Sequence, residues 1–188
     1  MRHVLDGASR MRDQIESLLH FSSVGTIEAS FQRTSAAVVL ETALENLTVA
    51  IHERSAEVTS DPLPEIAAEP ALLAEVFQNL IGNAIKFNQD RIPRVHISAS
   101  RQDSDWVFSV RDNGIGIEKR NAERMFKMFG SLNSRAEYPG TGLGLMITRK
   151  ILERHKGRIW FESKPSEGTT FYFSIPAATE AASQASGR

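Results

Sequence analysis

The sequence contains no cysteine, and it has neither a long apolar run nor a large excess of charge of one sign. Without cysteine the chain cannot form disulfides or thiolate metal sites. A net charge of −1 provides no electrostatic footprint for nucleic acid or an anionic membrane surface, so we expect neither partner. No stretch is long and apolar enough for a membrane-spanning segment, and the charged N-terminus is unlike a signal peptide. We therefore expect a cytoplasmic location.

The composition that remains suits one domain of ordinary size. The chain has 188 residues, and 41% of them are hydrophobic, which is enough for a substantial core. Residues 177–188 are rich in Ala, Ser, Thr and Gln, which predicts a disordered tail. Apolar periodicity and turn signals predict helices over 2–22, 36–53, 70–87 and 144–152, and strands near 29–33, 57–60, 65–67, 93–101, 106–110, 158–163 and 169–175.

The most informative stretch is 111–117, which directly follows the predicted strand over 106–110 and carries an acid and two glycines. Alternation along the strand places Asp112 on the same face as its large apolar residues, at the end of a buried surface. Gly114 and Gly116 let another group approach the backbone closely. A carboxylate in such a pocket suits a flat ring with an exocyclic amine. An ordinary Asp-Asn-Gly turn between strands is the other interpretation.

The helix predicted over 70–87 carries three polar side chains along one line. Asn79, Asn83 and Lys86 follow the spacing i, i+4 and i+7, which puts them one turn apart. An amide oxygen is a neutral, hard ligand that suits Mg²⁺, and an ammonium group suits a phosphate. Because Asn is a poor helix former, two of them four residues apart favour a function over a merely solvated face.

Four stretches, taken in chain order, resemble the ATP-binding boxes of the two-component sensor histidine kinases. They read FQNLIGNAIKF at 77–87, RDNGIGI at 111–117, MFKMF at 125–129 and GTGLGL at 140–145, and are followed by GRIWFE at 157–162 and GTTFYF at 168–173. The same superfamily contains DNA gyrase, a heat-shock chaperone and a mismatch-repair ATPase. Residues 134–139 look like the phytochrome-type kinases in particular. The resemblance runs from about residue 1 to residue 176.

This resemblance implies an α/β two-layer sandwich, in which three helices cover one face of a mixed sheet of about five strands. Residues 25–176 would form this catalytic ATP-binding domain. Residues 1–24 resemble the second helix of a dimerisation and histidine-phosphotransfer hairpin, whose first helix would precede Met1. The apolar residues of this coiled-coil-like helix have heptad spacing, namely Val4, Ala8, Met11, Ile15 and Leu18. A surface helix that packs on its own domain is the alternative.

The resemblance also implies a role for individual residues, with ATP and Mg²⁺ as the bound cofactors. Asp112 would select adenine, and Asn83 would hold the Mg²⁺ that bridges the phosphates. Asn79 and Lys86 would help to hold the triphosphate, and Phe87 would pack near the sugar or base. Residues 118–144 would contain a lid over the nucleotide. The other implied contacts are Gly114, Gly116, Ile117, Phe126, Lys127, Gly140, Thr141, Gly142, Leu143, Gly144 and Thr170.

The implied reaction moves the γ-phosphoryl group of Mg-ATP to a histidine, for relay to an aspartate on a response regulator. In the gyrase and chaperone branches a water-activating Glu stands where this chain has Asn79, and an amide cannot act as a general base. None of the five histidines has the surroundings of the family's acceptor, and His52 comes nearest. A non-phosphorylating ATP-binding or docking module is the alternative function. A protein serine kinase of the same superfamily is a third.

Overall fold

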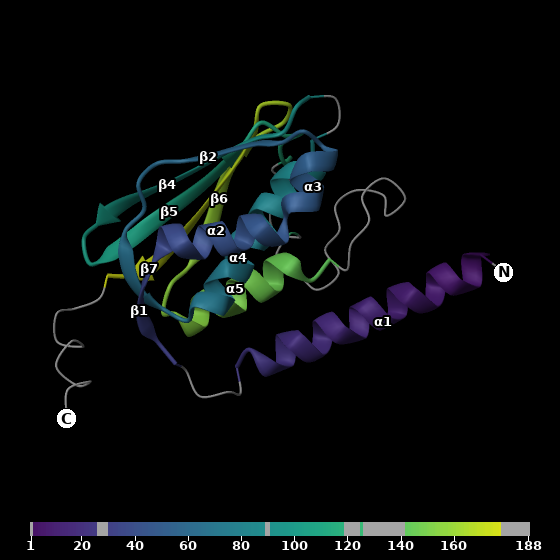
Figure 1. Ribbon diagram of the computed structural model, residues 1–188, viewed down its shortest axis with the longest axis horizontal. Coiled ribbons are helices and arrows are strands. Elements are labelled where there is room, and N and C mark those ends of the chain that lie inside the picture. The colour runs from purple at the N-terminus through teal and green to yellow at the C-terminus, as the bar shows by residue number, and fades with distance from the viewer. Residues whose placement is uncertain (1, 26–29, 89–90, 119–124, 126–141, 178–188) are drawn as a thin grey trace.

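Figure 1 shows the ribbon of a computed structural model. The structure describes residues 2–25, 30–88, 91–118, 125 and 142–177, and it describes side chains from residue 11 onward. No helix among these residues is long and apolar enough to cross a bilayer. The elements, in chain order, are α1 (Arg2–Ser23), β1 (Gln32–Ser35), α2 (Ala36–Asn46), α3 (Thr48–Glu53), β2 (Glu57–Ser60), β3 (Glu65–Ala68), α4 (Pro70–Lys86), β4 (Arg94–Gln102), β5 (Asp105–Asp112), α5 (Gly144–Arg154), β6 (Ile159–Lys164) and β7 (Gly168–Pro176).

The main sheet has five strands in the order β2-β4-β5-β7-β6. It is mixed, because β2 and β4 run parallel while every other neighbouring pair is antiparallel. Helices α2, α4 and α5 lie on one face of it, and α1 runs along the outside of this helical layer (Figure 1). The predicted two-layer α/β sandwich with three helices on one face is therefore confirmed.

The core lies between this sheet and α4. Phe108 of β5 stacks on Phe173 of β7 with ring centroids 4.9 Å apart, and Phe77 of α4 meets both rings edge-on. The alternation predicted for 106–110 is thus real, because Phe108 and Val110 are buried on the helix side of the sheet. Helix α4 packs against α2 and α5 as well as the sheet. The line of Asn79, Asn83 and Lys86 therefore belongs to the central helix of the domain.

One helix differs from its prediction. Residues 36–53 were expected to form a single helix, but they form α2 and α3 with a break at Leu47. The Leu47 N–H donates to Leu44 O, three residues back, at 3.0 Å. The Thr48 hydroxyl donates to the Glu45 carbonyl oxygen at 2.7 Å. These local bonds occupy the Leu44 and Glu45 carbonyl oxygens, which would accept from N–H groups four residues later in a continuous α-helix. The helix is therefore interrupted at this point.

The first strand also differs from its prediction. It was expected near 29–33, whereas β1 spans Gln32–Ser35 and residues 26–29 lie outside the described part of the chain. Among the described strands, β1 pairs only with β3. The pair is antiparallel, with Gln32 opposite Ala68 and Ser35 opposite Glu65. The two strands form a separate small sheet, so only five of the seven described strands belong to the main sheet.

Candidate functional site

Asp112 ends β5 with its carboxylate held at one oxygen. Oδ1 accepts hydrogen bonds from the backbone N–H groups of Gly114 at 2.8 Å and Thr169 at 3.1 Å. Among the described residues, Oδ2 accepts no hydrogen bond. Burial raises the pKa of Asp112, and the two N–H donors oppose that rise only in part. The result is a fixed, partly buried carboxylate with one oxygen available to a donor from a ligand.

The segment that follows Asp112 lies between the end of α4 and the β6–β7 turn. Ile115 N donates to Phe87 O at 3.0 Å, and Ile117 N donates to Ser163 Oγ at 2.8 Å. Gly116 has φ +70°, and a Cβ there would lie 2.0 Å from Lys164 O. Only glycine fits this backbone and this approach. The end of α4, the segment after β5 and the end of β6 are distant in the sequence but lie together beside Asp112.

The polar line on α4 meets the start of α5. A Cβ on Gly144 would lie 3.0 Å from Asn79 Oδ1, so the first turn of α5 passes directly against the Asn79 amide. Asn79 Nδ2 is buried and donates to no group among the described residues. A buried amide without a partner is uncommon in native proteins and indicates a missing ligand or water. Helix N-termini favour anions, so this junction suits a phosphate.

Lys86 and Asn83 complete the line toward the end of α4. The Lys86 Nζ lies 4.6 Å from the centroid of the Phe87 ring, and burial lowers the pKa of this ammonium group. Asn83 is partly buried one turn earlier. No group of three or more His, Asp or Glu residues that could hold a metal occurs among the described residues. The Asn83 amide oxygen stays a predicted metal ligand from the sequence.

The second glycine box is described only in part. Gly142 has φ +72°, Leu143 is fully buried, and Gly144 begins α5. Phe126, Lys127, Gly140 and Thr141 lie outside the described residues, as does almost all of the expected lid. Within that segment the structure describes Met125, which is buried in the core.

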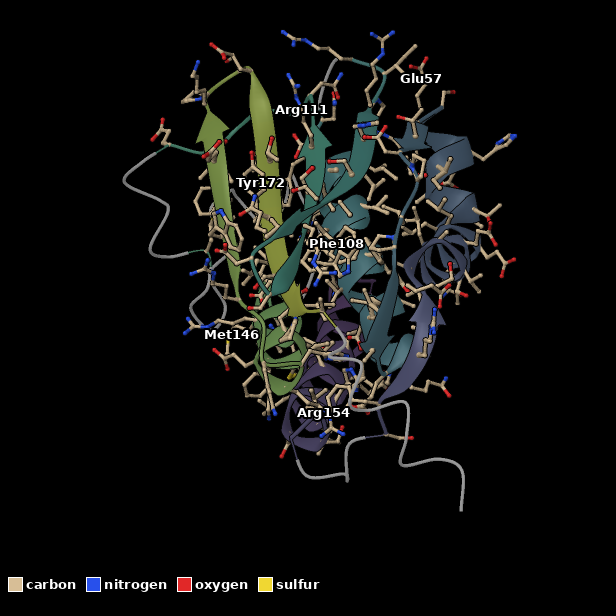
Figure 2. The ribbon with its side chains drawn as sticks, turned by 90° about the vertical axis from the view of Figure 1, so that its left-hand side faces the viewer. Glu57, Phe108, Arg111, Met146, Arg154 and Tyr172 are labelled. Atoms are coloured by element: carbon tan, nitrogen blue, oxygen red, sulfur yellow. The ribbon has the colours of Figure 1, made fainter. Side chains whose placement is uncertain are left out.

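Thr170 is next to the residue that bonds Asp112, and its role at the site stays a prediction. It pairs with Arg111 across β5 and β7, and alternation puts both residues on the face of the sheet away from the helices, with Tyr172 (Figure 2). Its neighbour Thr169 lies on the Asp112 side and donates its N–H to the carboxylate. The choice between two adjacent threonines depends on strand register, which the sequence does not specify.

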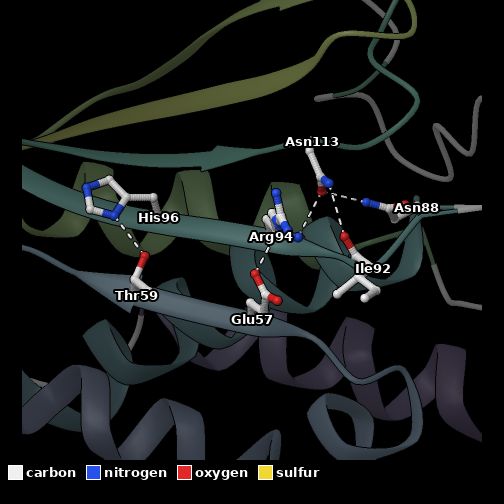
Figure 3. A network of polar contacts seen from close by, with 7 residues as sticks. All are labelled: Glu57, Thr59, Asn88, Ile92, Arg94, His96 and Asn113. Carbon is white, nitrogen blue, oxygen red and sulfur yellow. Dashed lines mark hydrogen bonds and ion pairs between the residues drawn. The ribbon is translucent and has the colours of Figure 1, made fainter.

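Two asparagines that were not proposed as site residues connect the ends of α4 and β5 (Figure 3). Asn113 Oδ1 accepts from Asn88 Nδ2 at 2.6 Å and from Arg94 N at 2.8 Å, and its Nδ2 donates to Ile92 O at 3.0 Å. The tendency of Asn to bond nearby backbone in turns is the one signal that could have indicated Asn113. Nothing in the sequence pattern indicates Asn88.

Comparisons with known proteins agree with this geometry. Residues 68–179, more than half of the chain, match the family described as histidine kinase-, DNA gyrase B-, and HSP90-like ATPase. The chain is 46% identical to cyanobacterial phytochrome A of Nostoc sp. over 98% of its own length and 24% of that protein. It is 31% identical to the methanogenesis regulatory histidine kinase FilI of Methanothrix harundinacea, over 89% of this chain and 19% of FilI. The chain thus spans about a quarter or less of these curated relatives.

Solved structures show the same fold. The crystal structure of full-length ShkA in complex with AMPPNP superposes with a TM-score of 0.77 at 28% identity, over 93% of this chain and 37% of ShkA. The nucleotide-free catalytic domain of histidine kinase ThkA has a TM-score of 0.67 at 25% identity, over 79% of this chain and 96% of that domain. The chain therefore belongs to the histidine kinase-, DNA gyrase B- and HSP90-like ATPase family, as a catalytic ATP-binding domain of the kind found in sensor histidine kinases.

Proposed function

We propose that this chain binds Mg-ATP and presents its γ-phosphoryl group to a histidine on a phosphotransfer helix outside this chain. The observation that carries the proposal is the Asp112 carboxylate, held at Oδ1 by two backbone N–H groups while Oδ2 accepts nothing among the described residues. The free oxygen suits the exocyclic amine of adenine. ShkA, which matches 93% of this chain, was solved in complex with AMPPNP.

The phosphate end of the proposed site lies at the junction of α4 and α5. Three features suit a triphosphate: Asn79 Nδ2, which has no partner among the described residues, the partly buried Lys86 ammonium, and the first turn of α5. Asn83 would supply an oxygen ligand to Mg²⁺, which neutralises phosphate charge when bound. Gly140, Thr141, Phe126 and Lys127 remain predicted contacts, because they lie outside the described residues.

The residue chemistry favours transfer to a nucleophile over hydrolysis. Asn79 has a neutral amide where a hydrolase of this superfamily would need a general base, and an amide cannot take a proton from water. The protein then acts mainly by positioning the phosphoryl group and stabilising its charge. Three of the described histidines are engaged elsewhere. His20 contacts Glu75, His96 contacts Thr59, and the buried His155 ring contacts Glu69 N and Ile151 O. These contacts support an acceptor outside the chain.

The partners of the proposed kinase follow from the same reaction. A phosphohistidine would pass its group to an aspartate on a response-regulator receiver domain. Homodimerisation would occur through the N-terminal hairpin, and apolar side chains exposed on α1 support this, namely Met11, Ile15, Leu18 and Leu19. The cytoplasmic location remains a prediction from composition.

The proposal is tested by nucleotide binding and by phosphoryl transfer. Calorimetry with ATP and Mg²⁺ should show binding that Asp112→Asn weakens by about 10-fold or more, because a hydrogen bond to a charged group contributes about 1.5–3 kcal/mol. Asp105→Asn at the other end of the same strand is the matched control and should bind normally. With γ-labelled ATP the chain alone should acquire no acid-labile label, whereas a separately supplied histidine-phosphotransfer hairpin should be labelled.

Each other outcome contradicts a definite part of the proposal. Label on the chain alone would place the acceptor among its own histidines. Asp112-dependent binding without transfer to any hairpin would support a non-phosphorylating docking module instead. Binding that is insensitive to Asp112→Asn would overturn the nucleotide site itself.

A further inference from the structure

We propose that Asn113 is a positioning residue that sets the span between the adenine end and the phosphate end of the nucleotide site. The inference rests on the proposed function, because it concerns how that site is held. Among the described residues, the Asn113 side chain makes three hydrogen bonds, to Asn88, Arg94 N and Ile92 O (Figure 3). Both Asn113 Oδ1 and Nδ2 are therefore engaged, and the amide acts on the nucleotide through its neighbours.

The link to Asn88 is the part of this network that reaches α4. The Asn88 side chain is 2% exposed, and its Nδ2 donates to Asn113 Oδ1 at 2.6 Å. The Arg54 guanidinium donates to the Asn88 carbonyl oxygen from the other side. This bond is buried at its Asn88 end, where a polar group left without a partner is costly. The position of Asn88 is thus fixed by both its side chain and its backbone.

The two asparagines each follow a residue of the proposed site. Asn88 is two residues beyond Lys86, at the end of α4, and Asn113 directly follows Asp112, at the end of β5. The amide–amide bond therefore ties the chain leaving the phosphate-binding helix to the chain leaving the adenine-binding strand. It lies beside a second link, because Ile115 N donates to Phe87 O at 3.0 Å.

The network also anchors the other side of this loop. Asn113 Nδ2 donates to Ile92 O, and Asn113 Oδ1 accepts from the N–H of Arg94, the first residue of β4. One side chain thus connects the segment after α4, the start of β4 and the end of β5. Removing it would free the end of α4 to shift relative to Asp112 while the core around Phe108 remains in place.

This arrangement has a different consequence for long and short ligands. ATP would contact both ends of the site, so its affinity depends on the separation of the two ends. A shift of one end relative to the other therefore weakens the ligand that must engage both ends at once. Adenosine would contact only the Asp112 end. Loss of the Asn113 network should therefore weaken ATP binding much more than adenosine binding.

The test compares two ligands on the unmodified chain, Asn113→Ala and Asn88→Ala. Dissociation constants for ATP with Mg²⁺ and for adenosine are measured by calorimetry or competition. We expect each variant to lose about 10-fold or more in ATP affinity and less than about 3-fold in adenosine affinity. Because both substitutions remove the same bond, the double variant should lose less than the product of the two single effects. If Asn113→Ala does not fold, Asn88→Ala alone decides the ratio.

Two controls break neighbouring polar contacts that do not reach Asn113 (Figure 3). Thr59→Ala removes the bond to His96 at 2.9 Å, and Glu57→Gln weakens the ion pair with the Arg94 side chain at 2.9 Å. Neither should change the ratio of ATP to adenosine affinity. An equal loss for both ligands in Asn113→Ala, with a lower Tm, would mean that Asn113 only stabilises the fold and would overturn this inference. Absence of Asp112-dependent binding in the unmodified chain would instead overturn the proposed function, and this inference with it.

Discussion

The Asp112 carboxylate is partly buried, and among the described residues only one of its two oxygens accepts hydrogen bonds. Its Oδ1 is fixed by Gly114 N and Thr169 N, yet desolvation still raises its pKa above the ordinary value of 3.8. A buried acid with an unused oxygen costs stability when ionised, which the protein tolerates at sites that bind a ligand. If Asp112 contacts the nucleotide as proposed, its protonation links pH to nucleotide affinity.

We predict that ATP affinity falls on acidification at a higher pH than an exposed aspartate would produce. In the proposed site the ionised Asp112 would accept a hydrogen bond from the adenine amine, so affinity would be present at neutral pH and lost as the pH falls through the raised pKa. The folding contribution of Asp112 has the opposite sign, because its raised pKa favours the folded state at low pH and that contribution is lost as pH rises. Calorimetry across the acid range measures the affinity.

The control for this prediction is Asp112→Asn. Its side chain does not titrate, so the pH dependence of its ATP affinity comes from ATP and the other groups of the protein. Subtracting its pH profile from that of the unmodified chain isolates the Asp112 contribution. Identical profiles for the two proteins would show that this carboxylate does not contact the nucleotide.

At the scale of elements, α4 and α5 are joined at the end away from the site. Arg154 Nε and Nη2 donate to the two carboxylate oxygens of Glu69 at 2.6 and 3.1 Å, with both side chains largely buried. Arg154 Nη1 also donates to Val24 O at 3.1 Å, and His155 Nε2 accepts from Glu69 N. Figure 2 shows Arg154 at the opposite end of the domain from Arg111. This cluster therefore holds the chain after α1, the start of α4 and the end of α5 together.

We predict that Arg154→Met lowers the free energy of unfolding by about 1.5–3 kcal/mol, because it removes charge-assisted hydrogen bonds from a shielded carboxylate. Arg149→Met is the matched control on the same helix. It removes an exposed pair with Glu153 at 2.8 Å and should cost less than about 0.5 kcal/mol. Urea unfolding measures both variants, and equal effects would contradict a structural role for Arg154.

The pH dependence of this effect has a definite sign. The hydrogen bond from Arg154 lowers the pKa of Glu69 below its ordinary 4.5. The stabilisation is therefore complete above that ordinary value and is lost as the pH falls through the lower folded pKa. The difference between the unmodified chain and Arg154→Met should shrink over the same range.

At the scale of the whole molecule, α1 touches the domain near its C-terminal turn. His20 Nε2 lies 2.7 Å from Glu75 Oε2 on α4, and Lys150 of α5 donates to Phe21 O. Earlier in the helix, Met11 and Ile15 are 60% and 58% exposed. An exposed apolar stripe at heptad spacing favours association with another helix.

We predict that the chain self-associates through this stripe in sedimentation experiments. Substituting both Met11→Glu and Ile15→Glu should shift the chain to monomer, because each places a charge in the apolar contact. Val38→Glu on α2 changes a similarly exposed valine and should leave the association unchanged. A monomeric profile for the unmodified chain would contradict the prediction.

The sequence by itself determined the features that depend on local period and composition. Helical periodicity predicted α4 and its polar line, and alternation predicted that Asp112 ends a buried face. Both predictions gave the right kind of element, because helical periodicity and strand alternation depend only on residues that are close in the sequence. The motifs also indicated the family, since each box is contiguous in the chain.

Only the tertiary structure decided the features that depend on pairing between distant segments. Which of the two adjacent threonines donates its N–H to Asp112 follows from the register of β5 and β7, and the pairing of β1 with β3 follows from docking outside the main sheet. The bond between Asn88 and Asn113 joins residues 25 positions apart. Such contacts depend on how elements pack, because the hydrogen bonds of a side chain are set by whatever the fold brings to it.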